Sequence, residues 1–294
     1  MPSSLFEKVL IPTDFSKYAS KVVECAAEIP GVKEVVLLNV VSMDPLARVW
    51  DPVAEVKDAE KRLMETRKTL KAPGIEVKVK AVSVLEGEVA SAIEKVAEEE
   101  KVQLVVMGAR GKSLIESVLL GSVSRNVLRF GNTNLLIMRY KAVEGAEGLE
   151  KFCARIFAKV PFPTDFSEPA GAAPSFLSAI DGIGEIVLLH VVHKGETQQE
   201  IDSNLAESKR KVEEISKKIS SGGRKISSRV GMGHPVEVIR NVAKEEYASL
   251  VAMSSQGAEA IKRGHIGSTA YDVANSLDRP VLILRRSQIA MYFV

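Results

Sequence analysis

A set of glycines after one apolar segment has the residue types and spacing of an anion-binding site. Leu104–Met107 is followed by Gly108, by Gly111 and, after nine further residues, by the pair Gly121 and Ser122. Glycine lets backbone N–H groups approach an anion closely, and a helix starting here would add unpaired N–H groups and a favourable dipole. Alternatively, Gly108 and Gly111 are only turn residues and Gly121 ends a short helix.

A carboxylate follows another apolar segment, within the stretch PTDFS. This stretch occurs at Pro12–Ser16 and again at Pro163–Ser167, each time directly after an apolar run. At the ligand-binding edge of a sheet, Asp14 could accept a hydrogen bond from a ribose hydroxyl or an adenine amine. Alternatively, Asp14 and Ser16 only start a helix, with Ser16 as its N-cap.

The chain repeats itself. EVVLLNVV at 34–41 matches EIVLLHVV at 185–192, and NLLIMR at 134–139 matches PVLILR at 280–285. With 294 residues, and roughly 150 residues for a typical domain, two tandem domains are expected. We predict domains at 1–143 and 153–288, a linker at 144–152 and an apolar C-terminal tail at 289–294.

Each half alternates continuous apolar runs with helical patterns. Runs without polar alternation are typical of strands buried on both faces of a parallel sheet. We therefore predict an α/β fold with two tandem, doubly wound, five-stranded parallel sheets, which bind ligands at the carboxyl ends of their strands. The predicted strands are 6–12, 34–41, 75–82, 103–108, 134–138, 155–161, 185–192, 225–230, 249–253 and 280–285. The predicted helices are 16–29, 52–71, 88–100, 122–130, 168–180, 198–219, 235–246 and 268–276.

Composition narrows the function classes. Apolar residues make up 46%, enough for a packed core, while a net charge of +2 is too balanced for a general nucleic-acid binder. No apolar run approaches the ~18 residues of a membrane span, and the N-terminus does not read as a secretory signal. Only two cysteines occur, Cys25 and Cys153. We interpret both as core residues of a protein in a reducing cytoplasm.

Three features of the sequence suggest known functional motifs but do not match them. GARGKS at 108–113 ends like a P-loop, but a Walker A sequence would need glycine at Val106. GHIGS at 264–268 lacks the final histidine of the nucleotidyl-transferase HIGH motif. The four histidines show no metal-ligand spacing, and we interpret His190, within an apolar run, as a satisfied core histidine.

These motifs together resemble the universal stress protein family, in its ATP-binding branch. PTDFS, LLNV at 37–40 and G-x2-G-x9-G-[ST] carry the resemblance, which covers nearly the whole chain as two copies. It implies an adenine-nucleotide site in each half. The residues it implies are Pro12, Thr13, Asp14, Val40, Met107, Gly108, Gly111, Gly121, Ser122 and Val123 in the first half, and Pro163, Thr164, Asp165, Val191, Gly257, Gly267, Ser268 and Thr269 in the second.

The second half departs from the family pattern at one glycine. Ser254 stands where the first half has Gly108, while Gly257 and the pair Gly267-Ser268 keep their spacing. A side chain there would be strained if the backbone required a positive φ. We therefore expect the second site to be weaker than the first.

The expected function is that of a cytoplasmic stress-response regulator that binds ATP, ADP or AMP. Mg²⁺ would enter only through the phosphates, with no metal site of its own, and we identify no catalytic residue. A slow ATPase or nucleotidyl-transfer enzyme, or a nucleotide-free interaction module, are the alternatives. The resemblance further implies pairing through the last strands, 134–138 and 280–285, and we expect a homodimer of tandem chains that binds neither nucleic acid nor membrane.

Overall fold

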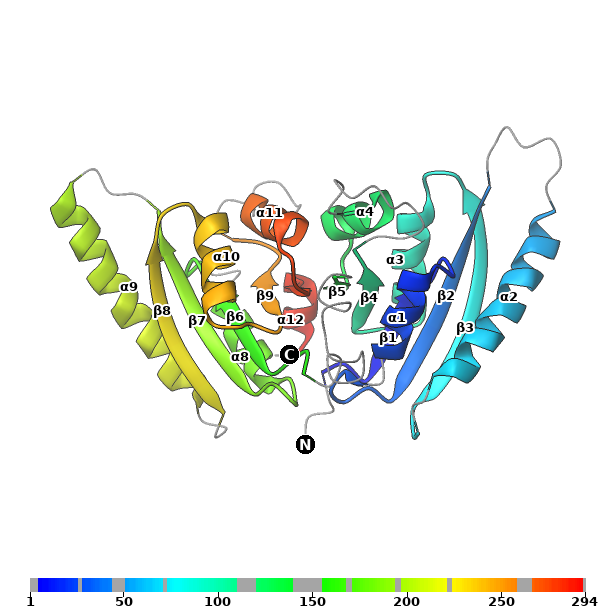
Figure 1. Cartoon of the computed structure of the whole chain (residues 1–294), viewed down its shortest axis with the longest axis horizontal. Helices are drawn as coiled ribbons and strands as arrows, with labels where there is room; N and C mark the ends of the chain where they lie inside the picture. Colours follow the sequence, from blue (N-terminus) through cyan, green and yellow to red (C-terminus); the bar gives the residue numbers. More distant parts are fainter. Residues whose placement is uncertain are drawn as a thin grey trace. The chain divides into compact units, whose positions relative to one another are not determined.

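The chain forms two compact units, Met1–Ala154 and Arg155–Val294. The structure is a computed structural model, shown in Figure 1. It describes residues 5–25, 28–43, 51–70, 73–109, 120–139, 155–167, 171–193, 197–220, 224–257 and 266–292. Within these ranges no helix is both long and apolar enough to cross a membrane.

The first unit is a parallel five-stranded sheet in the order β3-β2-β1-β4-β5. Its strands are β1 Lys8–Pro12, β2 Glu34–Met43, β3 Glu76–Leu85, β4 Leu104–Gly108 and β5 Asn134–Met138. Its helices are α1 Lys17–Cys25, α2 Pro52–Thr69, α3 Val89–Glu99 and α4 Ser122–Phe130. The strand order reverses between β1 and β4, which is where a doubly wound sheet binds its ligand.

Helices cover both faces of this sheet. The chain steps from β1 to β3 in one direction and then returns through β4 to β5, so right-handed crossovers put α1 and α2 on one face and α3 and α4 on the other. Helices α3 and α4 pack against each other, as this arrangement requires. The central strands are consequently buried on both sides, with Val9, Leu10 and Ile11 of β1 fully inaccessible.

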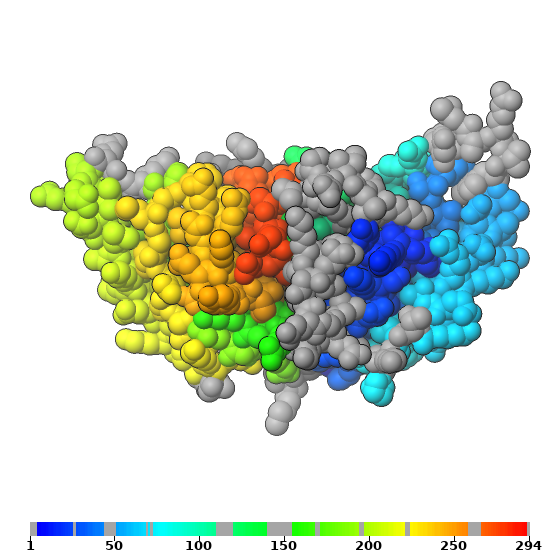
Figure 2. Space-filling model, in the orientation of Figure 1, coloured from blue at the N-terminus to red at the C-terminus, as the bar shows by residue number. Residues whose placement is uncertain are grey.

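The second unit repeats this order of elements. Its strands are β6 Lys159–Pro163, β7 Glu185–Val192, β8 Lys225–Met232, β9 Val251–Ser254 and β10 Val281–Leu284. Its helices are α8 Ala173–Ala179, α9 Gln198–Ile219, α10 Pro235–Glu245, α11 Ser268–Ser276 and α12 Arg286–Tyr292. Strands β6, β7 and β8 pair in parallel, as do β9 and β10. Helix α10 lies on the outer surface of this unit (Figure 2).

One proline changes the middle of the second sheet. In the first unit β1 reads KVLIP and Leu10 pairs with Val105 of β4, whereas β6 reads KVPFP and has Pro161 at that place. Proline has no N–H to donate to a neighbouring strand. Strands β6 and β9 still lie side by side, but Ser249 bridges them: its N–H donates to the Lys159 oxygen and its Oγ accepts from the Lys159 N–H, each over 3.0 Å.

The structure departs from the predicted elements at a few places in the second half. Strand β6 was expected at 155–161 but spans Lys159–Pro163, because the buried apolar residues Ile156 and Phe157 precede the strand instead of belonging to it. The predicted helix 168–180 is α8, which begins at Ala173. The predicted apolar tail holds the end of α12, whose Tyr292 packs its ring edge against Phe176 of α8.

Two further expectations concern the cysteines and the joint between the halves. Cys25 is buried on α1, as expected for a core residue, but it carries a disulfide bond, so the expectation of reduced cysteines is wrong for it. Cys153, the only other cysteine of the sequence, lies outside the described residues, as does the predicted linker 144–152. The pairing of the last strands of the two halves stays a prediction.

Candidate functional site

The loop after β1 is anchored to the neighbouring strand β2. The Thr13 N–H donates to the Leu38 carbonyl oxygen over 2.8 Å, and the side-chain amide of Asn39 donates to the Thr13 oxygen over 2.7 Å. Thr13 is only 5% exposed, so water competes little for these bonds. The predicted site residue Thr13 therefore fixes the point from which Asp14 extends.

Asp14 and Ser16 form the turn that starts α1. The Ser16 N–H donates to Asp14 Oδ1 over 3.0 Å, and the Ala19 N–H donates to Ser16 Oγ over 3.2 Å. The second bond confirms Ser16 as the N-cap of α1. Starting the helix uses Oδ1 of Asp14, and a carboxylate has a second oxygen able to accept from a ligand. The two roles considered for Asp14 are therefore compatible.

Phe15, between these two residues, has a left-handed backbone with φ 61°, which is uncommon for a bulky side chain. The guanidinium carbon of Arg62, on α2, lies 4.0 Å from the Phe15 ring centroid. A cation over an aromatic face is attractive, so this contact ties α2 to the turn. Nothing in the sequence pattern of α2 distinguishes Arg62 from its charged neighbours.

The end of β4 and the start of α4 are joined by short hydrogen bonds. The Gly121 N–H donates to the Ala109 oxygen over 2.8 Å, and the Ser124 hydroxyl donates to the Gly108 oxygen over 2.9 Å. The Ala109 N–H donates in turn to the oxygen of Met138, at the end of β5, over 2.8 Å. The predicted residues Gly108 and Gly121 are thus brought together.

Helix α4 begins without a side-chain cap. Gly121 is its N-cap residue, with φ −66° and ψ 163°, and, being glycine, it offers no side-chain cap to the first turn. Ser122 is therefore not the N-cap of α4 but already its first helical residue. The first turn has no acidic residue, and Arg125 places its guanidinium there by donating to the Leu120 oxygen over 3.0 Å. Both features favour an anion.

The other predicted residues of the first unit are distributed over the same edge. Strands β1 and β4 are paired neighbours, so their carboxyl ends lie next to each other. Pro12 ends β1, Val40 lies on β2, Met107 is buried on β4, and Val123 is in the first turn of α4. Gly111 lies outside the described residues, and so do Arg110 and Lys112.

The second unit repeats the turn with one exchange. The Thr164 N–H donates to the Leu189 oxygen over 2.8 Å, after Pro163 ends β6. His190 takes the place of Asn39, and its Nδ1 lies 2.8 Å from the Thr164 oxygen. The expectation that His190 has a hydrogen-bonded partner is confirmed. The ring is only half-buried, however, so it is not a core histidine.

Asp165 lies directly against the glycine loop of its own unit. A Cβ atom added to Gly257 would be 2.3 Å from Asp165 Oδ2, so any other residue there would require this carboxylate to move. The Ser167 N–H donates to Asp165 Oδ1 over 3.0 Å, as in the turn of the first unit. The two predicted residues Asp165 and Gly257, far apart in sequence, therefore meet at one edge of the second unit.

The remaining predicted residues of the second unit also gather there. The Gly267 N–H donates to the Ser255 oxygen over 2.8 Å, and Gly267 is the N-cap residue of α11, which begins with Ser268 and Thr269. Neither Ser254 nor Gly108 is among the residues with positive φ. The left-handed strain considered for Ser254 is therefore absent, and the Ser254 hydroxyl bonds to the Gln256 oxygen over 2.9 Å.

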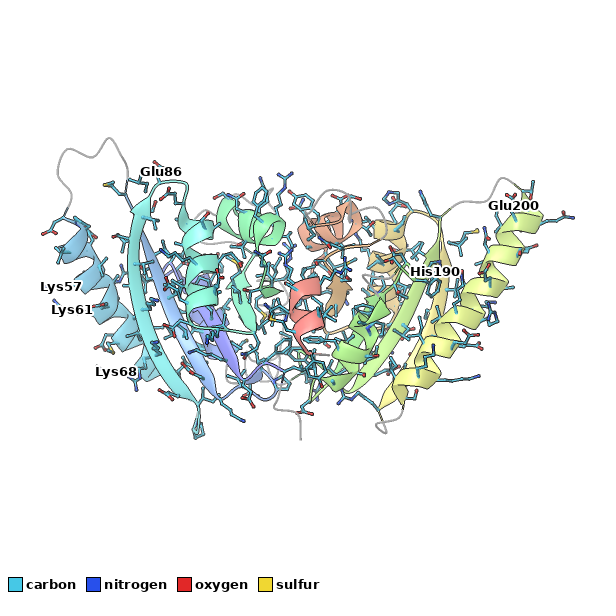
Figure 3. The ribbon with its side chains drawn as sticks, turned by 180° about the vertical axis from the view of Figure 1, so that it is seen from behind. Lys57, Lys61, Lys68, Glu86, His190 and Glu200 are labelled. Atoms are coloured by element: carbon cyan, nitrogen blue, oxygen red, sulfur yellow. The ribbon has the colours of Figure 1, made fainter. Side chains whose placement is uncertain are left out.

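A cavity of about 250 Å³ opens between the end of β7 and α9 in the second unit. Figure 3 shows His190 on β7, on the side of the unit where α9 runs. The predicted residue Val191 belongs to its lining. The lining residues are Phe166, His190, Val191, Val192, His193, Asn204, Glu207, Ser208 and Lys211. Across the described parts of the chain, no three His, Cys, Asp or Glu side chains are grouped to hold a metal ion.

Both units match one sequence family. The Universal stress protein family matches residues 5–139 and again residues 157–285. The chain belongs to this family. The two matches fall one in each compact unit, and the parallel sheets with helices on both faces are the tandem universal stress protein fold.

Similar proteins divide into single-domain and full-length relatives. A universal stress protein of Methanothermobacter thermautotrophicus is 33% identical over 144 residues, covering 46% of this chain and 97% of the relative. One of Methanocaldococcus jannaschii is 28% identical over 156 residues, covering 45% and 96%. The crystal structure of a universal stress protein from Archaeoglobus fulgidus is similar over 97% of this chain and 98% of its own, with a TM-score of 0.71 and 24% identity. This last similarity concerns the tandem fold.

Proposed function

We propose that the first unit of this universal stress protein binds an adenine nucleotide, ATP, ADP or AMP, at the carboxyl edge of its sheet. The observation that carries the proposal is the uncapped start of α4 at Gly121, hydrogen-bonded to the end of β4 and accompanied by Arg125. Backbone N–H groups of the first helical turn have no acceptors within the helix, so they can bind phosphate oxygens.

The nucleoside would lie toward β1 and β2. Asp14 extends from the buried Thr13 at the end of β1, and Val40 is at the same edge on the adjacent strand. The carboxylate of Asp14 can accept from ribose hydroxyls or from an amine, whereas it would repel phosphates. This division places the base and sugar at β1 and β2 and the phosphates at α4. Mg²⁺ would be held through the phosphates.

A substitution at Gly121 tests the phosphate assignment. Gly121→Val would put a branched side chain at the N-cap, where phosphate oxygens would approach the backbone. Since hydrogen bonds to charged groups contribute roughly 1.5–3 kcal/mol each, we expect ATP affinity to fall at least about tenfold in calorimetry. Gly171→Val serves as a matched glycine control, because a Cβ atom at Gly171 would meet nothing within 4 Å and Gly171 lies in the second unit. Equal ATP affinity of the Gly121→Val protein and wild type would overturn the assignment.

The same purified chain separates binding from catalysis. Mass spectrometry of the protein as isolated would identify a retained nucleotide, and phosphate release from ATP would measure hydrolysis. Retained nucleotide without turnover supports a regulatory binding protein, and turnover supports a slow ATPase. Absence of both would favour a nucleotide-free interaction module. The cytoplasmic location and the homodimer of tandem chains stay predictions.

A further inference from the structure

The cavity of the second unit contains imidazoles that the first unit lacks. All four histidines of the chain, His190, His193, His234 and His265, lie in the second half of the sequence. In the matched segments EVVLLNVV and EIVLLHVV, His190 stands at the place of Asn39. Continuing the same alignment, His193 stands at the place of Ser42. The two units therefore present different hydrogen-bonding groups at the end of the same strand.

The ring of His190 is held in one tautomer. The Thr164 carbonyl can only accept, so the short contact with His190 Nδ1 requires the proton on Nδ1. The Phe166 ring stacks on this imidazole, with centroids 4.2 Å apart and planes 22° apart. In the neutral ring Nε2 is then a hydrogen-bond acceptor. His190, which lines the cavity, thus has its remaining ring acceptor held in one orientation.

His193 has a similar arrangement at the same cavity. Its Nδ1 lies 3.2 Å from the Gly233 carbonyl oxygen, which again assigns the proton to Nδ1 and leaves Nε2 as the acceptor. The His234 ring, at the start of α10, meets the His193 ring edge-on with centroids 5.9 Å apart. The cavity is therefore lined by two imidazoles that each contact a backbone carbonyl through Nδ1.

The charged side chains around His190 come from α9 and from the loop after β6. From α9, Lys211 places its Nζ 5.6 Å from the Phe166 ring centroid and forms a 2.6 Å ion pair with Glu207. Burial lowers the pKa of His190 and Lys211 lowers it further, while the hydrogen bond to Thr164 and the charge of Asp165 oppose them. The net lowering keeps this ring neutral at neutral pH.

The size and the acceptors of the cavity select a class of ligand. A volume of about 250 Å³ is below the roughly 300–1,000 Å³ of pockets for drug-sized ligands, so it suits one ring system and not a whole nucleotide. Neutral imidazole acceptors match N–H donors such as the exocyclic amine of adenine. Among the described residues, no three His, Cys, Asp or Glu side chains are grouped to hold a metal ion. An organic base is therefore a better ligand for this cavity than a metal ion.

We propose that protonation of His190 releases the amino-substituted heteroaromatic base of a nucleotide held in this cavity of the second unit. The inference rests on the nucleotide site proposed for the first unit being repeated in the second, with the phosphates at the start of α11. Protonation turns Nε2 of His190 from an acceptor into a donor on a cationic ring, which repels an amine and adds to the charge of Lys211. The first unit, with Asn39 at this place, has no such gate.

Adenosine is the probe, because its own charge does not change between about pH 5 and about pH 8, the range in which an ordinary imidazole titrates. In the full-length chain the histidine ring signals in NMR report on the second unit alone, since the first half has no histidine. At about pH 8, adenosine should shift the His190 and His193 signals. At about pH 5 the apparent affinity should be about tenfold lower, as for loss of one good hydrogen bond. Inosine, with a carbonyl in place of the amine, should bind more weakly at the higher pH.

An exchange of residues between the units is the matched variant. His190→Asn supplies the amide that already donates to the Thr13 oxygen in the first unit, so the turn should be retained. Adenosine binding to the second unit of this variant, followed through the His193 ring signal, should lose most of its dependence on pH. The reciprocal Asn39→His change should introduce that dependence in the first unit, where its new ring signal reports it.

The outcomes separate this inference from the proposed function. If ATP binds by calorimetry while the ring signals of His190 and His193 ignore both ATP and adenosine, the pocket assignment is overturned and the nucleotide function stands. If the rings respond to adenosine but ATP binds no more tightly than adenosine, the phosphate site is overturned and the pocket stands. Unchanged pH dependence in His190→Asn would overturn the gate.

Discussion

The first strand of each unit meets the neighbouring central strand in a different way. In the first unit Leu10 and Val105 form part of a regular parallel ladder between β1 and β4. In the second unit Pro161 removes the ladder donor at that place, while Ser249 bridges β6 and β9 at Lys159 just as Gln103 bridges β1 and β4 at Lys8. The bridge at the start of the strand is therefore common to both units, and the difference between them is the ladder donor that Pro161 lacks.

The largest effect is expected when the proline of the second unit is introduced at the matching position of the first. Leu10→Pro removes a ladder donor and a fully buried side chain. Gln103 already accepts from the Lys8 N–H over 2.8 Å through its side chain, so the start of the strand has no further bond to gain. We expect the first unit to lose about 3 kcal/mol or more of unfolding free energy. Urea unfolding measures this, and a loss below about 1 kcal/mol would show that the ladder is dispensable in both units.

Matched ion networks at the opposite edge of the two sheets give a second, smaller test. Glu100 contacts Lys78 over 2.7 Å and Lys8 over 3.1 Å, and Glu246 contacts Lys159 and Arg229. The hydrogen bond from Lys78, followed by that from Lys8, lowers the pKa of Glu100 from 4.5 to about 2. The hydrogen bond from Lys159 lowers the pKa of Glu246 in the same direction.

A depressed carboxylate pKa stabilises the folded state above the ordinary value and loses that contribution as the pH falls. The contribution of Glu100 should therefore be complete above about pH 4.5 and disappear as the pH approaches 2. Glu100→Gln should cost about 1–2 kcal/mol at neutral pH and flatten the acid limb of the stability curve. Thermal unfolding at several pH values, with Glu246→Gln as the matched variant, measures this. An unchanged acid limb would assign the loss to other carboxylates.

The smallest effect is expected at the glycine that the second unit lacks. Neither Gly108 nor Ser254 has a positive φ, so the penalty for a side chain at that backbone conformation does not apply. Ser254→Gly should change the affinity of the second unit for adenine nucleotide by less than about threefold, well below the effect of an αL penalty of roughly 1–2 kcal/mol. Calorimetry on the Gly121→Val background isolates the second site. A gain of tenfold or more would show that the Ser254 side chain obstructs the ligand.

The pattern of the sequence predicts the sheets well because buried parallel strands are continuous apolar runs. Strand β5 spans the predicted residues 134–138, and helices α4 and α9 also begin and end where expected. The start of β6 could not be predicted in this way. Ile156 and Phe157 are as buried as the strand residues, so hydrophobicity alone places the strand too early.

The candidate site could be predicted less completely, since its contacts depend on conformation. The repeat alignment itself shows the exchange of Asn39 for His190, and this signal could have directed attention to the cavity. By contrast, the left-handed backbone of Phe15 and the position of Arg62 over its ring depend on a turn geometry that residue types do not specify. The same holds for Arg125, whose place in the first turn of α4 becomes meaningful only once the helix start is known.

The missing ladder between β6 and β9 has a mechanical consequence for the second unit. Its sheet consists of two hydrogen-bonded pieces, β6-β7-β8 and β9-β10, that meet along a seam. The seam ends between Asp165 and Gly257, the two candidate residues that face each other across it. A ligand that contacts both residues would hold the two pieces of the sheet together. Hydrogen exchange along β6 and β9 should therefore slow on nucleotide binding more than exchange along β1 and β4, where the ladder already resists separation.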